Sequence, residues 1–156
     1  YAHILNDARS TWCDTLPRLM SVAAELEQQV GEISLVFGHN DLLPANFMDD
    51  GKRLWLIDWD YAGFNSALFD LGGLASNCEL SAELEQHMLY QYFDRSPDTT
   101  QLKKYSAMKC ASLLRESLWS MVSEIHAQIE FDYPAYTRHN LELFEQAWQS
   151  HQQSGN

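Results

Sequence analysis

Residues 39–46 read HNDLLPAN, and this polar segment lies between two short apolar runs, ISLVF at residues 33–37 and LWLI at residues 54–57. Each apolar run has the length of a strand. Asp41 lies within the polar segment, and Asp58 directly follows the second run. Carboxylates at the ends of buried strands are costly unless they are hydrogen-bonded or bound to a cation. The stretch therefore predicts a site where a loop and a strand end meet.

Three residues of this stretch are oxygen donors suited to metal binding or proton transfer. Asn46 and Asp58 carry hard oxygen ligands, which suit Mg²⁺ and leave positions for phosphate oxygens and water. Asp41 is then free to accept a proton from a substrate hydroxyl. The alternative is that these residues cap turns, as Asp and Asn commonly do. The spacing H-N-D-x-x-x-x-N, followed by an apolar strand and I-D, favours the first interpretation, because kinases use this arrangement of base and metal ligands.

The segment before this stretch carries a helical pattern. Its apolar residues recur every three or four positions, at Trp12, Leu16, Leu19, Ala23, Leu26 and Val30. Such spacing is typical of one face of an amphipathic helix. Pro17 suits the first turn of that helix, which we expect to start near Thr15, and Gly31 ends it.

The rest of the chain is predicted to be one small hairpin followed by helices. The turn sequence DDGK at residues 49–52 separates the pair Phe47-Met48 from the run at residues 54–57, which indicates a hairpin. From Ser66 onward the pattern is helical. The sequence DTTQ at residues 98–101 resembles a capping arrangement that opens a long helix. The core stripe of that helix is expected to be Ala111, Leu114, Leu118, Val122, Ile125 and Ile129.

The composition is that of one folded domain. The chain has 156 residues (18.0 kDa), of which 46% are hydrophobic and 12% aromatic, and this excludes a disordered chain. No apolar run approaches the ~20 residues that span a bilayer. The formal net charge of −12 argues against a nucleic acid or an anionic membrane as partner. The cysteines at positions 13, 78 and 110 form no CxxC pair, so we expect reduced thiols in a cytoplasmic protein.

Three segments together resemble the choline/ethanolamine kinase family, which belongs to the aminoglycoside-phosphotransferase-like kinases. They are HNDLLPANF at residues 39–47, LIDWDYAG at residues 56–63 and FDLG at residues 69–72. The Asn at position 40 is similar to choline kinases, since aminoglycoside enzymes more often have Gly there. The resemblance covers nearly the whole chain and implies a mainly α fold with a small β-hairpin, the C-terminal (helical) lobe of a protein-kinase-like fold.

The resemblance also implies roles for individual residues. It makes Asp41 the catalytic base and gives His39 the task of orienting the catalytic loop through hydrogen bonds. Asn46, in the same loop, and Asp58 would bind Mg²⁺, with ATP as co-substrate. Asp70 matches the family's buried Asp, which hydrogen-bonds the catalytic loop.

The C-terminal third resembles the family's binding site for a quaternary ammonium. By this resemblance, Trp119 and Tyr136 are members of an aromatic box, although both could equally be core aromatics of a helical lobe. A cation over an aromatic face gains ~0.5–2 kcal/mol. Asp60 occupies the position of an acidic residue near the cation and is a third candidate for the substrate site.

Two positions depart from the family pattern. Eukaryotic choline kinases have a second Trp where this chain has Glu116, and the family has a Glu where this chain has Asn77. An acidic Glu116 replaces aromatic cation binding with ion pairing, which suits choline, ethanolamine or another amine. These departures concern the substrate rather than the reaction.

The whole of residues 1–156 is expected to be a single lobe. We expect the first helices in residues 1–31, the catalytic loop and metal-binding hairpin in residues 32–65, and a helical substrate-binding part in residues 66–156. Kinases of this group take a phosphate-binding Lys from an N-terminal nucleotide lobe, and these residues contain no counterpart of it. The isolated chain is therefore expected to transfer phosphate poorly or not at all.

Three functions agree with the sequence. The first is an ATP-dependent kinase of choline, ethanolamine or a similar amino alcohol. The second is a kinase of aminoglycosides or of other small-molecule hydroxyls. The third is a non-catalytic amine-binding module derived from a kinase lobe. The sequence leaves open whether the protein forms a homodimer.

Overall fold

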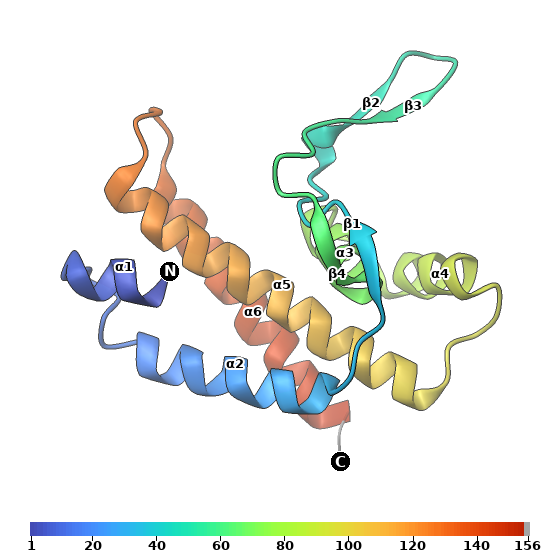
Figure 1. The fold of residues 1–156 in the computed structure, drawn as a ribbon, viewed down its shortest axis with the longest axis horizontal. Helices are drawn as coiled ribbons and strands as arrows, with labels where there is room; N and C mark the ends of the chain where they lie inside the picture. The colour runs from blue at the N-terminus through green and yellow to red at the C-terminus, as the bar shows by residue number, and fades with distance from the viewer. Residues whose placement is uncertain (155–156) are drawn as a thin grey trace.

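The computed structural model describes residues 1–154, which form helices and two small sheets (Figure 1). The helices and strands are, in chain order, α1 (Ala2–Asp7), α2 (Leu16–Val30), β1 (Leu35–Gly38), the short 3₁₀ helix η1 (Pro44–Asn46), β2 (Phe47–Asp49), β3 (Leu54–Leu56), β4 (Gly63–Ser66), α3 (Ala67–Asn77), α4 (Ala82–Phe93), α5 (Thr99–His126) and α6 (Tyr133–Ser154). None of the helices in residues 1–154 is long and apolar enough to cross a membrane.

The long helix α5 is the centre of the fold. It begins at the predicted capping box, in which the Asp98 carboxylate accepts from the Gln101 backbone N–H and the Gln101 side chain accepts from the Asp98 backbone N–H. Helices α6, α3 and α2 all pack against α5 (Figure 1). The buried core between α2, α5 and α6 includes Leu19, Leu26, Ala107, Cys110, Leu114, Met121, Phe144 and Trp148.

Helix α2 follows its predicted bounds. Thr15 precedes it, Pro17 lies in its first turn, and Gly31 ends it at a φ of 60°, where a side chain would be strained. Burial raises the local stability of such a helix more than its intrinsic propensity does. Its predicted apolar face is the face that packs on α5.

Helix α3 packs closely on α5, and this packing sets the position of residues 38–40, which α3 contacts. A Cβ on Gly72 would lie 2.7 Å from the Cα of Lys109, so no larger residue fits without moving one helix. The Ser66 hydroxyl caps α3 by accepting from the Leu68 N–H. Helix α3 therefore presents its first turn, which contains Asp70, to residues 38–40.

The strands form two separate antiparallel pairs. The predicted hairpin is confirmed: β2 pairs with β3, with Phe47 opposite Leu56, and projects away from the helices (Figure 1). The second pair joins β1 to β4 over Leu35 to Gly38 and Gly63 to Ser66. Strand β4 was not among the predicted elements, because its partner is distant in the sequence.

The predicted core stripe of α5 is wrong at its C-terminal end. The helix ends at His126, so Ile129 lies beyond it and is 75% exposed, and Ile125 is 40% exposed. The apolar period continues in the sequence, but the helix ends here and the chain forms a loop that leads into α6 at Tyr133. That loop contributes to the candidate site described below.

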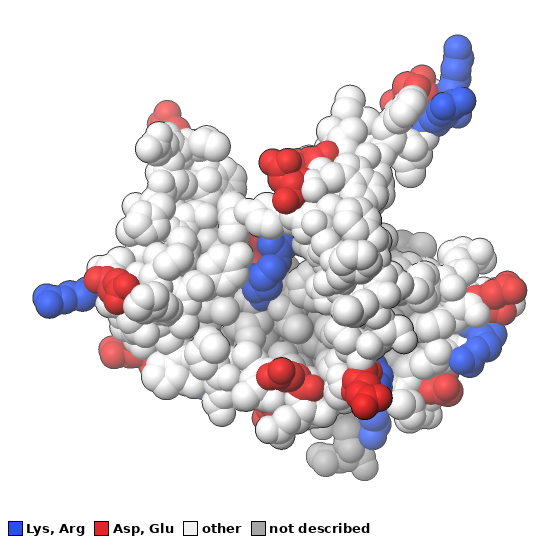
Figure 2. Space-filling view, viewed as in Figure 1, with Lys and Arg blue, Asp and Glu red and all other residues white. Residues whose placement is uncertain are grey.

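The charged groups are scattered over the face shown in Figure 2. This face is hollowed between the α5–α6 side and the side that bears the hairpin, and basic and acidic atoms meet in the hollow (Figure 2). The dispersed acidic surface agrees with the net charge of −12.

Candidate active site

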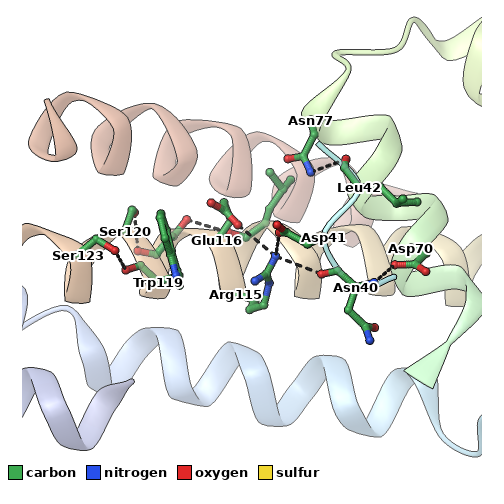
Figure 3. A network of polar contacts seen from close by, with 12 residues as sticks. Asn40, Asp41, Leu42, Asp70, Asn77, Arg115, Glu116, Trp119, Ser120 and Ser123 are labelled. Carbon is green, nitrogen blue, oxygen red and sulfur yellow. Dashed lines mark hydrogen bonds and ion pairs between the residues drawn. The ribbon is translucent and has the colours of Figure 1, made fainter. Parts of the chain in front are cut away.

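The loop of residues 39–46, called here the 39–46 loop, is held at its start by Asp70. The two carboxylate oxygens of Asp70 accept from the backbone N–H groups of His39 and Asn40, each at 2.7 Å. Figure 3 shows Asp70 beside Asn40. The carboxylate lies so close that a Cβ on Gly38 would be 2.7 Å from Asp70 Oδ2. Charge-assisted bonds of this length are strong. A side chain larger than that of glycine at position 38 would therefore displace the Asp70 carboxylate that holds the loop.

Asn40 joins the 39–46 loop to the segment before β4. Its side-chain amide donates to the carbonyl oxygens of Tyr61 at 3.1 Å and Gly63 at 3.3 Å, and its side-chain oxygen accepts from Asn65 at 2.9 Å. The φ of Asn40 is 63°, a region that Asn and Gly adopt more readily than other residues. This backbone geometry explains why Asn and Gly are the two residues expected at position 40.

His39 is buried and connects the loop to the hairpin. Its Nε2 lies 2.9 Å from the carbonyl oxygen of Ile57, so Nε2 carries the proton and donates. The ring also packs edge-on against Trp59, with centroids 4.8 Å apart. Within residues 1–154, Nδ1 of His39 has no hydrogen-bond partner. These contacts fit the orienting role expected for His39, which stays a prediction.

A backbone hydrogen bond links the segments that carry the two expected metal ligands, Asn46 and Asp58. The carbonyl oxygen of Asn46 accepts from the N–H of Ile57 at 3.0 Å, and Asp58 directly follows Ile57 in the chain. The Asn46 amide nitrogen donates to the Asp41 carbonyl oxygen at 2.9 Å, which leaves its side-chain oxygen for other partners. Asp58 is exposed and has a φ of 60°.

These donors fit a magnesium ion. They are one amide oxygen and one carboxylate, the hard oxygen ligands that Mg²⁺ takes in small number together with water and phosphate oxygens. No group of three or more His, Cys, Asp and Glu in residues 1–154 forms a metal site of the all-protein kind. Asn46 and Asp58 as magnesium ligands therefore stay a prediction.

A cavity of about 340 Å³ opens beside Asp41. Its lining consists of Asp41, Leu43, Tyr61, Arg115, Glu116, Trp119, Ile129, Glu130, Phe131, Tyr133 and Tyr136. The structure thus brings Asp41, Glu116, Trp119 and Tyr136 to one cavity, and their roles there stay predictions. Asp60 is exposed and lies beside Tyr61, outside this lining, so its role in substrate binding stays a prediction.

The floor of the cavity is a chain of charged and polar contacts from α5 to the 39–46 loop (Figure 3). Arg115 Nη2 donates to Asp41 Oδ1 at 2.9 Å and lies 3.3 Å from Glu116 Oε2. Tyr136 donates its hydroxyl to Glu116 Oε1 at 2.9 Å. Burial raises the pKa of Glu116, although Arg115 and the hydrogen bond from Tyr136 oppose the shift. The cavity therefore has two carboxylates and one guanidinium at its base.

Aromatic rings form the wall of the cavity. Trp119 packs on Tyr133 with centroids 6.2 Å apart, and Phe131 packs on Tyr133 and Tyr136 at 5.0 and 5.6 Å. All these pairs are edge-to-face, the arrangement that aromatic pairs prefer. Aromatic faces beside carboxylates make this cavity suited to a small organic cation.

Several residues of the site were missed in the sequence. Arg115 was not singled out, because its partner Asp41 is 74 residues away in the sequence. Tyr133 and Phe131 lie in the C-terminal third, close to the predicted Tyr136, so their aromatic character was the available signal. Asn77, noted as a departure, donates its amide to the carbonyl oxygen of Leu42 at 2.9 Å, a bond that an ionised Glu could not donate.

A second, larger cavity lies away from Asp41, between α3, α4, α5 and α6. Its volume is about 730 Å³. An ion pair between Lys109 and Glu85 and a hydrogen bond from Tyr105 to Glu85 lie in its wall. These contacts join α4 to α5 and leave the 39–46 loop untouched.

Comparison with known proteins identifies relatives. The model of the choline/ethanolamine kinase family matches residues 7–102. LicA of Haemophilus influenzae is 30% identical over 124 residues, which are 76% of this chain and 46% of that protein. A probable ethanolamine kinase of Arabidopsis thaliana is 31% identical over 133 residues, 72% of this chain and 36% of that protein. A crystal structure of LicA in complex with AMP matches with a TM-score of 0.68 and 24% identity, over 88% of this chain and 47% of that chain.

The chain thus spans less than half the length of these relatives. At 24% identity the structural match speaks for the fold alone. The expected fold, a mainly helical lobe of a protein-kinase-like architecture with a small hairpin, is confirmed.

Proposed function

Because this chain belongs to the choline/ethanolamine kinase family, we propose that the protein transfers the γ-phosphate of ATP to the hydroxyl of choline, ethanolamine or a similar small amino alcohol. The observation that carries the proposal is the cavity in which Asp41 faces a wall of aromatic rings and the carboxylate of Glu116. A proton acceptor at one end and a cation-binding surface at the other suit a molecule with a hydroxyl and an ammonium group.

Asp41 is the proposed general base. Its carboxylate lines the cavity, and the Asn46 amide and the Asp70 carboxylate hold the backbone around it. A base in a fixed position accepts the hydroxyl proton as the oxygen attacks the phosphorus, and most of the rate comes from such positioning and from charge stabilisation. The hydrogen bonds of the 39–46 loop supply this positioning.

Asn46 and Asp58 are the proposed ligands of magnesium. When bound there, the ion would neutralise charge on the phosphates of ATP. Asn46 is hydrogen-bonded to Asp41 and to Ile57, the residue before Asp58. These bonds support the assignment, since the base and the phosphate must meet at the same point.

The function is tested by Mg²⁺-dependent ADP release from ATP in the full gene product that contains this chain. Choline, ethanolamine and an aminoglycoside are supplied as separate acceptors. We expect release with choline or ethanolamine and little with the aminoglycoside. Release with the aminoglycoside alone would favour the second function considered above. Binding of an amine without release from any acceptor would favour a non-catalytic binding module.

Trp119→Ala in the same assay tests the aromatic wall. We expect the KM for the amine to rise by about 2- to 30-fold, because a cation–π contact contributes ~0.5–2 kcal/mol. Trp55→Ala is the matched control, since Trp55 is an exposed tryptophan on the hairpin, outside the cavity. An unchanged amine KM in Trp119→Ala would contradict the proposed box.

Glu116 should make amine binding depend on pH. Its raised pKa means that it gains a proton, and loses its charge, at a higher pH than an ordinary glutamate. The amine KM should therefore rise as the pH falls through that raised pKa, while Asp41, Arg115 and Tyr136 are the other titratable groups facing it. The experiment measures the amine KM between about pH 5 and 8.

Glu116→Gln is the control for this pH effect. It keeps the shape and an acceptor for Tyr136 but has no charge. We expect an amine KM about tenfold higher at neutral pH, from the loss of a charged contact worth ~1.5 kcal/mol, and a much flatter pH profile. A profile that keeps its slope in this variant would rule out Glu116 as the titrating group.

A further inference from the structure

Arg115, on α5, contacts the carboxylates of Asp41 and Glu116 in the cavity. Its Nη2 donates to Asp41 Oδ1 at 2.9 Å and to the Asn40 carbonyl oxygen at 3.3 Å, and it lies 3.3 Å from Glu116 Oε2 (Figure 3). Its guanidinium also lies 5.7 Å from the ring centroid of Tyr61. Arg115 thus joins α5 to the 39–46 loop and to the segment that follows the hairpin.

The surroundings of Arg115 keep it charged. Burial alone lowers its pKa, but the hydrogen bond to Asp41 and the charges of Glu116 and Asp41 more than offset this effect, and the net shift is upward. Its side chain is 21% exposed, and those of Asp41 and Glu116 are 14% and 10% exposed. The carboxylates of Asp41 and Glu116, which both contact the same guanidinium, would repel each other if that cation did not lie between them.

The contact leaves the two oxygens of the Asp41 carboxylate in different states. Oδ1 accepts from Arg115, whereas Oδ2 accepts no hydrogen bond from any residue of the described chain. A carboxylate fixed through one oxygen and free at the other can present that second oxygen to a hydroxyl in one orientation. Placement of this kind matters, since a misplacement of ~1 Å can cost about 100-fold in rate.

We propose that Arg115 is a positioning residue that holds Asp41 through Oδ1, so that Oδ2 accepts the proton of the substrate hydroxyl. The proposal rests on the proposed function. Arg115 acts on the reaction through its contact with Asp41.

Arg115→Met and Arg115→Lys test the proposal in the full gene product. Methionine keeps the apolar stem without charge, and we expect kcat to fall by about 10- to 100-fold. The amine KM should not rise, because removal of a positive charge beside Glu116 leaves the field on the ammonium as favourable or more so. Lysine keeps the charge without the planar fork, so its kcat should fall between the two.

Lys109→Met is the matched control. Lys109 is also on α5 and also forms a half-buried ion pair, with Glu85 at 2.5 Å, but in the wall of the other cavity. We expect it to lower the melting temperature while kcat stays within twofold. Arg115→Ala and Lys109→Ala are further compared with and without added guanidinium ion below denaturing concentration, and only the first should regain part of its kcat.

The outcomes separate the two proposals. A kcat within twofold of the unsubstituted protein in Arg115→Met, an equal loss in Lys109→Met, or a joint rise of the amine KM would each overturn the role of Arg115 alone. Absence of ADP release by the unsubstituted protein with every acceptor would overturn the proposed function, and with it any positioning of a base.

Discussion

Replacement of Asp41 by asparagine in the full gene product should lower kcat for amine-dependent ADP release by about 10²- to 10⁴-fold, the range that a general base contributes. Asparagine keeps the size of the side chain and an oxygen that can accept from Arg115, so the cavity should keep its shape. The amide, however, cannot take up the hydroxyl proton. The loss should thus appear in kcat, with the KM values for ATP and amine changed by no more than a few-fold.

Asp49→Asn is the control for this substitution. Asp49 is an exposed aspartate on the hairpin whose carboxylate accepts from the Gly51 N–H in the turn, away from the cavity. We expect its kcat to stay within twofold of the unsubstituted protein. The measurement is the steady-state kcat of both variants at saturating ATP and magnesium. If Asp41→Asn kept more than a tenth of the turnover, another group would have to be the base.

The sequence predicted those elements whose signals are local. The bounds of α2 follow from Pro17 and Gly31, and the start of α5 follows from the Asp98–Gln101 capping box. The hairpin follows from its turn, and the segment at residues 39–46 carries its own polar pattern. In each case the deciding residues lie within a few positions of each other, which is the range over which capping and turn chemistry act.

The features that were missed depend on contacts between distant segments. Strand β4 exists because Gly63 to Ser66 pair with β1, and its sequence alone has no strong strand pattern. Tertiary pairing of this kind overrides weak local preference. Arg115 likewise contacts Asp41 only because the packing of α3 on α5 brings the two residues together. Ile129 shows the opposite case, in which a local pattern is present without the structure. The apolar period of α5 continues in the sequence as far as Ile129, but the helix ends at His126.

Replacement of Asp58 by alanine is expected to have the second-largest effect. If Asp58 and Asn46 hold magnesium, loss of the carboxylate should raise the magnesium concentration needed for half-maximal rate and lower kcat by about 100-fold or more. Charge stabilisation by a catalytic metal is worth several kcal/mol, and each ~1.4 kcal/mol is tenfold in rate. The measurement is a magnesium titration of ADP release at saturating ATP and amine. Fold retention is expected, because Asp58 is exposed and its side chain forms no hydrogen bond within residues 1–154.

Asp60→Ala is the matched control for Asp58→Ala in this magnesium titration. Asp60 is also an exposed aspartate, two residues away, and lies outside the cavity lining. A magnesium ligand and a substrate contact act on different parameters: Asp58→Ala should shift the magnesium midpoint, whereas Asp60→Ala should leave it unchanged and raise the amine KM only if Asp60 reaches the substrate. Because both variants remove one negative charge from the same loop, a general electrostatic effect would shift both midpoints alike. Equal midpoints in Asp58→Ala and the unsubstituted protein would remove Asp58 from the metal site.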